Sequence, residues 1–401
     1  MKSFISLEDS IDILKSIKIN RKIEKVSLIQ GINRILASDV YSKINNPPFN
    51  KSAMDGYALN ANETIPEGTM LKVIGVIYAG QVFDGYVGVD ETVKIMTGAK
   101  IPNNCSAVIK KEDVIIGDNY IKLNKDIYKN DNVCHIGEDI SKGQLLIKKH
   151  TKLNYANIGI LASSGIDEIL VYKVPKIALL TTGDEVVDVY KELEDGKIYN
   201  SNKYSILSRL LELGYECEVV NHVSDEYEKI GKRIEELCSK VDLIITTGGA
   251  SVGDKDLIEE AINYIGGEIL FHKVNIKPGS AVLASQKDNT VIISLSGNPN
   301  AALTTFELLA KPMLRKLSGN DEEFIKREVA IINQCYNKKS KVTRFVRGKT
   351  FIEDGIQMVS ITQNNSGNGI LSSTLESNCL IEIEKGNKEL KKGDKVTIIK
   401  L

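Results

Sequence analysis

The strongest constraint on the fold is a regular alternation of apolar segments and helical segments between Val174 and Ser318. Four segments, "KIALLTT", "ECEVVNHV", "DLIITTGG" and "NTVIISLSG", are nearly continuous runs of apolar and β-branched residues, which is typical of strands. Each is followed by a segment with helical spacing of its apolar residues, such as "SNKYSILSRLLELG". Apolar strands that alternate with helices predict a mostly parallel sheet with helices on both faces, in a three-layer α/β domain.

The regions on either side of this segment have different residue patterns. Residues 1–46 contain short helical patterns, residues 47–143 are rich in turns and short β-like runs, and residues 321–401 return to β patterns. We therefore predict a multidomain protein of the α/β plus β class. Its predicted parts are an N-terminal helical linker domain (1–46 and 144–173), a β-rich insert domain (47–143), the α/β domain (174–320) and a small C-terminal β-barrel of about five strands (321–401).

The overall charge of the chain excludes general attraction to polyanions. The sequence has 52 basic and 53 acidic residues and a net charge of −1. We therefore expect neither nucleic acid nor membrane partners, and any anion site has to be built locally. The six cysteines form no C-x-x-C pair and the four histidines are dispersed, so neither a zinc cluster nor a disulfide framework is predicted.

The N-terminal segment "MKSFISLEDSIDILKSI" has the pattern of an amphipathic helix. Ser6 is the expected N-cap, and Leu7, Ile11, Leu14 and Ile17 form one apolar stripe. Acidic residues interrupt the apolar core that a signal peptide would need, and no apolar run approaches the ~18 residues of a membrane span. We expect a cytoplasmic protein.

Three of the predicted strands end in loops of the same kind, "TTGDE", "TTGGASVGDKD" and "SLSGNPN". The carboxyl ends of parallel strands share one edge of the sheet, so the loops are expected to converge on one crevice. Glycine lets backbone N–H groups approach an anion closely, and the N-terminus of each following helix adds a favourable dipole. One such loop could be only a tight turn, but three on one edge favour an anion site. The spacing matches neither the dinucleotide-binding nor the P-loop fingerprint.

Acidic residues cluster in and beside the same loops: Asp184, Glu185, Asp225, Asp254 and Asp256. Carboxylates beside a phosphate site would repel the ligand unless a hard cation lies between them, and Mg²⁺ is the usual bridge. Asp225 and Asp254 each precede a predicted helix and could instead be N-caps, so both roles stay open for them. Glu185 and Asp256 are poorly placed for capping, which favours a functional role.

Basic residues occur at short spacing in two segments. In "HKVNIKPGSA", Lys273 and Lys277 are four positions apart and would share a face if the segment is extended. Two like charges side by side suggest an anion between them, although on pattern alone solvated surface lysines are somewhat favoured. In "TRFVRGK", Arg344, Arg347 and Lys349 could equally belong to a basic edge strand.

Several motifs together resemble a known family. In chain order they are "PPFNKSAMDGYAL", "IMTGAKIP", "GEDI", "LLTTGDE", "IYNSNKY", "TTGGASVGDKD", "KVNIKPG", "SGNP" and "GILSS". This order is similar to that of the molybdopterin molybdotransferases, a family that includes the gephyrin E domain and the corresponding domain of plant molybdenum-cofactor proteins. The resemblance covers residues 4–400, and the strings "SAMDGYA" and "TTGGASVGD" are specific to it.

The resemblance implies a reaction and its participants. The family hydrolyses the phosphoanhydride of adenylylated molybdopterin, inserts molybdate into the dithiolene and releases AMP, with Mg²⁺ or another divalent cation. It also implies an elongated homodimer, formed through the linker domain, in which the partner subunit completes the active cleft. The adenylyltransferase of the preceding step and the molybdoenzymes that receive the cofactor are implied as further partners.

The resemblance assigns a role to individual residues. Asp55, Thr97 and Asp139 would line the cleft from the partner subunit. Glu185, Asp225 and Asp256 would hold the cation or activate water, and Lys273, Lys277 and Arg347 would neutralise molybdate and phosphate. The other residues predicted to bind substrate are Thr182, Gly183, Asp184, Ser201, Asn202, Gly248, Gly249, Ser251, Gly253, Asp254, Pro278, Ser296, Gly297, Asn298, Pro299, Arg344 and Asn368.

The chain departs from the usual pattern of the family at three positions. Ser296 replaces the first proline of an L-P-G-N-P loop, which predicts a looser turn. Asn368 stands where a serine is usual, and it can still donate a hydrogen bond to an oxyanion. Asn200 replaces the usual aspartate of a D-S-N motif, which indicates that a charge is dispensable there.

Two other functions compete with the molybdotransferase prediction. A gephyrin-like scaffold without catalysis is disfavoured because the acids and lysines are kept and no adenylyltransferase-like segment is joined to this sequence. The adenylyltransferase of the preceding step shares an α/β core with a "TTGGASVGD"-like loop, but "SAMDGYA" and the C-terminal β region favour the later step. The residues cannot distinguish molybdate from tungstate, which have nearly the same size and charge, nor Arg344 from Arg347 as the oxyanion contact.

Overall fold

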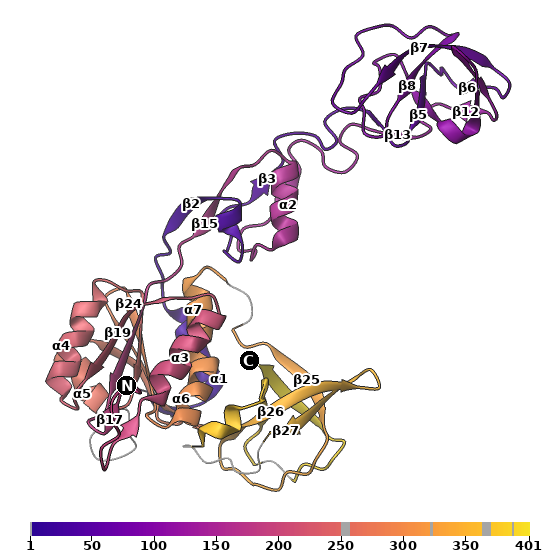
Figure 1. Ribbon diagram of the computed structural model, residues 1–401. Coiled ribbons are helices and arrows are strands. Elements are labelled where there is room, and N and C mark those ends of the chain that lie inside the picture. Colours follow the sequence, from indigo (N-terminus) through magenta and orange to yellow (C-terminus); the bar gives the residue numbers. More distant parts are fainter. Residues whose placement is uncertain (1, 250–256, 321–323, 363–369, 387–388) are drawn as a thin grey trace. The chain divides into compact units, whose positions relative to one another are not determined.

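The computed structural model describes residues 2–249, 257–320, 324–362, 370–386 and 389–401 (Figure 1). The chain forms two compact units, each with its own hydrophobic cores. The first contains Met1–Glu24, Asn33–Ala37 and Val171–Leu401, and the second contains Lys25–Ile32 and Ser38–Leu170. No helix in the described ranges combines the length and the apolar character needed to cross a membrane.

The first unit is built on a seven-stranded sheet. Its strands, in spatial order, are β1 (Lys2–Ile5), β21 (Glu268–Val274), β23 (Leu283–Lys287), β24 (Thr290–Leu295), β20 (Leu243–Thr247), β16 (Ile177–Thr182) and β19 (Cys217–Val223). β24, β20, β16 and β19 run parallel to one another and β1 runs parallel to β21, whereas β23 is antiparallel to both of its neighbours. The predicted mostly parallel sheet is confirmed.

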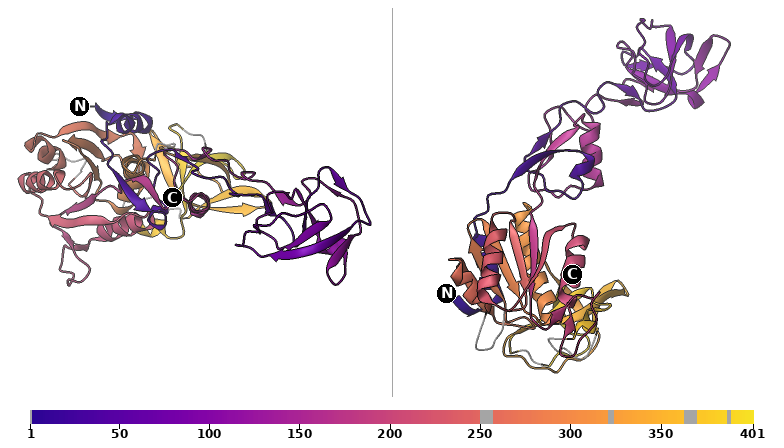
Figure 2. Two further views of the ribbon diagram at one scale, coloured as in Figure 1. Left: turned by 90° about the horizontal axis from the view of Figure 1, so that it is seen from above. Right: turned by 60° about the vertical axis from the view of Figure 1, so that its left-hand side comes forward.

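Helices cover both faces of this sheet, as Figures 1 and 2 show. Ala178 and Leu180 of β16 belong to the core under α4 and α5, and Ile177 and Leu179 belong to the core on the opposite face, under the other helices. The alternation of side chains along a strand therefore buries both faces of β16 and gives the predicted three layers. The helices are α1 (Leu7–Ser16), α3 (Ser201–Glu212), α4 (Tyr227–Cys238), α5 (Leu257–Tyr264), α6 (Pro299–Thr305), a π-helical turn (Phe306–Ala310) and α7 (Lys311–Leu317).

Three strands of the sheet were not predicted: β1, β21 and β23. β23 reads "LASQK" and carries too few large apolar residues to stand out as a buried strand. β1 precedes the N-terminal helix directly, and the whole segment was predicted as helix. The four-part domain division stays a prediction, and within it β1 and α1, which the prediction gave to the linker domain, pack with the α/β sheet.

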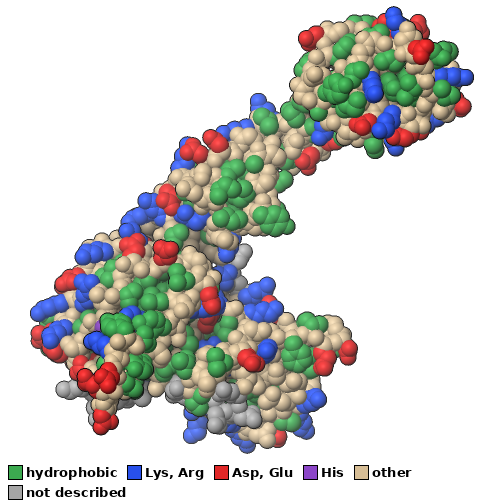
Figure 3. Space-filling view, in the orientation of Figure 1, with side chains coloured by type: hydrophobic (Ala, Val, Ile, Leu, Met, Phe, Trp, Pro, Cys, Tyr) green, Lys and Arg blue, Asp and Glu red, His purple; other side chains and the backbone are tan. Residues whose placement is uncertain are grey.

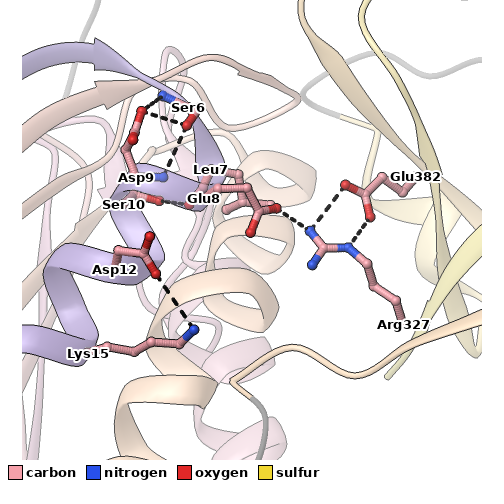
Figure 4. A network of polar contacts seen from close by, with 9 residues as sticks. All are labelled: Ser6, Leu7, Glu8, Asp9, Ser10, Asp12, Lys15, Arg327 and Glu382. Carbon is pink, nitrogen blue, oxygen red and sulfur yellow. Dashed lines mark hydrogen bonds and ion pairs between the residues drawn. The ribbon is translucent and has the colours of Figure 1, made fainter.

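The N-terminal helix begins where the sequence predicts. Ser6 is the N-cap of α1, and its Oγ accepts a hydrogen bond from the Asp9 backbone N–H at 3.0 Å (Figure 4). The Asp9 carboxylate accepts in return from the Ser6 backbone N–H, which completes a capping box. At the other end of α1, the Lys316 Nζ donates to the Leu14 and Ile17 carbonyl oxygens at 3.0 and 2.6 Å. Both ends of the helix are therefore satisfied.

Residues 324–362, 370–386 and 389–401 form the predicted small barrel. Five strands close in the order β26 (Thr343–Glu353), β27 (Ile356–Ile361), β25 (Arg327–Ile332), β29 (Lys395–Lys400) and β28 (Cys379–Ile383), and β28 pairs back with β26. β22 (Ile276–Lys277), which follows β21, extends this sheet by pairing in parallel with β26. Arg327 joins the barrel to α1, because its guanidinium contacts Glu382 of β28 and Glu8 of α1, each at 2.6 Å (Figure 4).

The second unit is rich in β-structure, as predicted for residues 47–143. Its main sheet has the order β10 (Val114–Ile116), β11 (Tyr120–Leu123), β7 (Met70–Ile77), β8 (Glu91–Ile95), β5 (Gly56–Leu59) and β9 (Ala107–Lys110). Three short ribbons pair β4 (Lys51–Ser52) with β13 (Val133–Cys134), β6 (Thr64–Ile65) with β12 (Ile127–Tyr128), and β3 (Val40–Tyr41) with β14 (Leu145–Ile147). The unit also contains the helix α2 (Tyr155–Ser163).

Candidate active site

A cavity of about 400 Å³ lies at the carboxyl-end edge of the parallel strands. The register explains why the loops meet there, since Thr181 pairs with Thr247 and Thr247 pairs with Leu295, so that β16, β20 and β24 end at the same level. The three predicted loops therefore converge. The cavity is lined by Thr182, Gly183, Glu185, Val186, Ile198, Tyr199, Asn200, Ser201, Asn202, Asp225, Thr247, Gly248, Gly249, Gly279, Ser280, Ala281, Ser296, Gly297, Asn298 and Pro299.

Glycine is required at the start of the central loop, directly after β20. Gly248 has φ +91°, and a Cβ at this position would lie 2.4 Å from the Thr182 carbonyl oxygen. Gly297, in the neighbouring loop, has open space by comparison, because the nearest atom to its Cβ would be the Gly248 Cα at 3.6 Å. The backbones of the three loops thus approach one another closely at Gly248, which leaves main-chain groups rather than side chains to form the floor of the cavity.

The N-terminus of α3 forms one side of the cavity. Its N-cap is Asn200, whose Oδ1 accepts from the Lys203 backbone N–H at 3.0 Å. Asn202 is buried, and its Nδ2 donates to the Gly297 carbonyl oxygen at 2.8 Å. The Oδ1 of Asn202 and the Oγ1 of Thr182 are buried without a hydrogen-bond partner among the described residues. A buried polar atom without a hydrogen-bond partner lowers the stability of the fold unless a ligand or a water molecule supplies the hydrogen bond.

Two of the three predicted metal ligands line the cavity. Asp225 has one carboxylate oxygen that is buried and has no hydrogen-bond partner in the described part of the chain. It is not the N-cap of α4, because that position is Glu226, so the structure decides against the capping alternative. Glu185 folds its carboxylate back over Gly183, where a Cβ would lie 3.1 Å from both of its oxygens. No group of three His, Cys, Asp or Glu residues that could hold a metal ion occurs within the described ranges.

Other predicted residues of these loops take supporting positions or lie outside the described residues. Asp184 does not line the cavity, but its Oδ1 accepts from the Asp225 backbone N–H at 3.3 Å and so helps to hold that residue. Residues outside the described ranges are Ser251, Gly253, Asp254, Asp256 and Asn368.

The two predicted lysines are not among the residues that line the cavity. Lys273 places its Nζ over the ring of Phe4, 5.6 Å from the centroid. Lys277 is exposed, and it is the register partner of Arg344, which brings these two predicted basic residues to adjacent strands. Pro278 is buried directly after Lys277, and residues 279–281 that follow do line the cavity.

Arg344 and Arg347 are both buried on β26, with 8% and 7% of their surface exposed. Arg347 lies 3.4 Å from Asn300 of α6, measured from Nε to Oδ1, and its Nη2 has no partner among the described residues. Burial lowers the pKa of Arg347 to about 10, and the nearby Glu307 opposes this shift. A buried guanidinium with a free N–H group is suited to an anion, but Arg347 does not line the cavity.

The remaining predicted residues belong to the second unit. Asp55 and Thr97 are in contact there, since one carboxylate oxygen of Asp55 accepts from the Thr97 backbone N–H at 2.8 Å and from its hydroxyl at 2.7 Å. These hydrogen bonds lower the pKa of Asp55. Asp139 accepts from the Asn46 side-chain amide at 3.1 Å. The role of these residues in a cleft of the partner subunit stays a prediction.

Sequence reasoning missed one wall of the cavity. β17 (Val186–Val187) and β18 (Ile198–Tyr199) form a short parallel ribbon, from which Val186, Ile198 and Tyr199 line the cavity. Their segments are too short for a periodic pattern. Ile198 and Tyr199 belong to the motif "IYNSNKY" and Val186 follows "TTGDE", but neither motif assigned a role to them. On the face drawn in Figure 3, acidic and basic side chains are interspersed, so this face has no large patch of a single charge sign.

Three family profiles match consecutive parts of the chain. They are described as the MoeA N-terminal region, domains I and II (residues 5–165), a probable molybdopterin binding domain (residues 178–316) and the MoeA C-terminal region, domain IV (residues 330–401). Together they span almost the whole sequence.

Individual proteins are similar over the same length. A molybdopterin molybdenumtransferase of Staphylococcus aureus is 36% identical over 379 residues, which covers 93% of this chain and 90% of the relative. One of Haemophilus influenzae is 34% identical over 380 residues and covers 94% and 93%. The crystal structure of a molybdopterin biosynthesis MoeA protein of Pyrococcus horikoshii aligns with a TM-score of 0.86 at 31% identity, over 99% of both chains.

Proposed function

The chain belongs to the MoeA family of molybdopterin molybdenumtransferases, and we propose that it hydrolyses adenylylated molybdopterin, releases AMP and inserts molybdate into the dithiolene. It is an enzyme of molybdenum cofactor biosynthesis. The observation that carries the finer proposal is the cavity at the ends of β16, β20 and β24, where glycine backbone, a helix N-terminus and two carboxylates meet.

The floor of the cavity is proposed to bind the diphosphate of the substrate. Gly248 and Gly249 leave the backbone of the central loop open to a ligand, and the N-terminus of α3 contributes its dipole. The Thr182 hydroxyl, which has no protein partner among the described residues, is placed to donate a hydrogen bond to a phosphate oxygen.

Mg²⁺ fits the acidic side of the cavity. Asp225 offers a buried carboxylate oxygen without a protein partner, and Glu185 is in the same cavity. We propose that these two, with Asp256, hold the cation. When bound, Mg²⁺ would offset the charge of the diphosphate and of the leaving AMP. The protein's part is to fix these carboxylates, and Asp184 supports Asp225 through the 3.3 Å hydrogen bond to its backbone.

Molybdate is proposed to bind beside the cavity, near the basic residues. Lys277 and Arg344 are neighbours in register, and the segment that follows Lys277 lines the cavity. Lys273 and the buried Arg347 are the other candidates for charge neutralisation. Because residues 279–281, which follow Lys277 and Pro278, line the cavity, we infer that the pterin dithiolene reaches from the diphosphate toward these cations.

The proposal includes the setting of the reaction. We propose a homodimer in which Asp55, Thr97 and Asp139 complete the cleft of the neighbouring subunit. We also propose that the reaction takes place in the cytoplasm, between the adenylyltransferase that supplies the substrate and the molybdoenzymes that receive the product.

A turnover assay tests the proposal. Purified protein is incubated with adenylylated molybdopterin and Mg²⁺, with or without molybdate, and released AMP is quantified by chromatography. We expect faster release with molybdate, and Asp225→Asn is expected to slow it by ~100-fold, a loss typical of an electrostatic group at a reaction centre. Asp12→Asn is the matched control, because Asp12 is an exposed aspartate of α1 that is absent from the cavity lining. AMP release that molybdate does not accelerate would overturn the proposal.

A further inference from the structure

The ribbon of β17 and β18 gives the cavity an apolar wall. Val186, Ile198 and Tyr199 line it, whereas the remaining lining is mainly glycine backbone with hydroxyl, amide and carboxylate side chains. The wall is not covered by the protein itself, because Ile198 is 55% and Tyr199 42% exposed. When a flat ligand packs against an exposed aromatic side chain in a cavity, burial of the apolar surface and stacking of the rings lower the free energy of the complex.

Hydrogen bonds hold this wall in place. Within the ribbon, the Ile198 N–H donates to the Glu185 carbonyl oxygen at 2.9 Å, and the Asn200 N–H donates to the Val187 carbonyl oxygen at 2.8 Å. Tyr199 lies between these two anchors. Its neighbour Asn200 is buried and also caps α3, so the backbone at Tyr199 is tied directly to a helix N-terminus.

Side-chain contacts also anchor the ribbon to α3. Asp188 follows β17, and its carboxylate contacts the Lys203 Nζ at 2.7 Å and the Tyr204 hydroxyl at 3.3 Å, both on α3. The ion pair is only about one-fifth exposed on each side. The wall is therefore preorganised, so that little conformational entropy is lost when a ligand packs against it.

We propose that Tyr199, flanked by Val186 and Ile198, stacks against a planar nitrogen heterocycle of the ligand whose phosphate binds at the Gly248 loop. This inference rests on the proposed function and deepens it, since it names a residue that selects for the ring rather than for the charge. The proposed substrate carries two such rings, a pterin and an adenine, and both present the flat π-face that an aromatic side chain recognises.

Binding measurements with three probes test the proposal. AMP, a pterin phosphate monoester and ribose phosphate are titrated calorimetrically into the full-length protein with Mg²⁺. Tyr199→Ala is expected to weaken at least one ringed probe by on the order of tenfold, the factor for one lost stacking contact, and to leave ribose phosphate unchanged. Tyr199→Phe keeps the ring and is expected to bind as the unaltered protein does. A selective loss for AMP assigns the wall to adenine, and a selective loss for the pterin phosphate assigns it to the pterin.

A matched control separates the wall from the loop that carries it. Tyr190 lies in the loop that joins β17 to β18, is 76% exposed and does not line the cavity, so Tyr190→Ala is expected to have no effect on any probe. Tyr199→Leu replaces Tyr199→Ala if circular dichroism shows that the alanine variant is misfolded. The proposal is overturned if the Tyr199→Ala and Tyr199→Leu variants bind both ringed probes with normal affinity, or if their affinity for ribose phosphate falls equally. It is also overturned if Tyr190→Ala lowers the same affinities, or if the unaltered protein binds no ringed probe more tightly than ribose phosphate. Molybdate-stimulated AMP release by the unaltered protein would then still support the proposed function.

Discussion

Replacing Gly248 by alanine is expected to damage both the stability of the first unit and its anion site. The new Cβ would lie 2.4 Å from the Thr182 carbonyl oxygen and 2.8 Å from its Oγ1, at a residue with φ +91°. The positive φ costs ~1–2 kcal/mol for a residue with a side chain, and relieving the overlap costs ~1–3 kcal/mol more. We therefore expect Gly248→Ala to lower the free energy of unfolding by roughly 2–5 kcal/mol.

Gly297→Ala is the matched control for this substitution. It adds the same methyl group in the facing loop, but its nearest neighbour would be the Gly248 Cα at 3.6 Å, an ordinary contact, and its φ lies outside the positive range. A change within ~0.5 kcal/mol is expected for it, as for substitutions without a specific clash.

The assay is urea unfolding of both variants followed by circular dichroism, because the chain has no tryptophan. Calorimetric titration with AMP is expected to show a loss of affinity of ~tenfold or more for Gly248→Ala, since the end of β16 and the central loop have to separate to accommodate the methyl group. Equal unfolding midpoints for Gly248→Ala and Gly297→Ala would refute the reasoning, because the close approach of the loops at Gly248 would then not constrain the fold.

Three further substitutions test other parts of the structure. Glu307→Gln removes the buried carboxylate that contacts the half-buried Arg209 at 2.6 Å, so we expect a loss of ~1.5–3 kcal/mol in urea unfolding, and an unchanged midpoint would contradict the account. Thr97→Val removes a hydrogen bond that lowers the pKa of Asp55, so the variant is expected to raise the pKa of Asp55 measured by NMR. The stabilisation from this bond is present above the unfolded pKa of Asp55 and is lost as the pH falls through its folded pKa. The variant is therefore expected to lose less stability than the unaltered protein over that acidic range. Gly159→Ala on α2, where nothing lies within 4 Å of the added Cβ, is expected to stabilise the second unit by ~0.5–1 kcal/mol, and a destabilised variant would be inconsistent with an ordinary helix there.

The parts of the fold that were predicted are those whose signal is local. All six residues of β16 (Ile177–Thr182) are buried, and such a continuous apolar run indicates a central strand without knowledge of its neighbours. The start of α1 was predicted from Ser6 and the apolar stripe that follows it, because a capping serine acts within one turn. The convergence of three loops followed from the rule that parallel strands end on one edge.

The parts that were not predicted depend on contacts between distant residues. β23 is a strand because two neighbours supply its hydrogen bonds, not because "LASQK" favours one. Lys277 pairs with Arg344 although the strands β23, β24 and β25 and the helices α6 and α7 lie between them in the chain. No spacing in the sequence indicates this pairing. Tyr199 lines the cavity beside Asn200, whose Nδ2 donates to the Thr181 hydroxyl of β16 at 3.0 Å, and this contact is likewise tertiary.

The central claim is that the phosphates of the substrate bind where the parallel strands end, and a crystal structure of the protein with adenylylated molybdopterin and Mg²⁺ tests it most directly. The account predicts phosphate oxygens within hydrogen-bonding distance of the Gly248 and Gly249 backbone N–H groups, with the cation against Asp225 and Glu185. A substrate bound with its diphosphate elsewhere, and only solvent in the cavity lined by these residues, would contradict it.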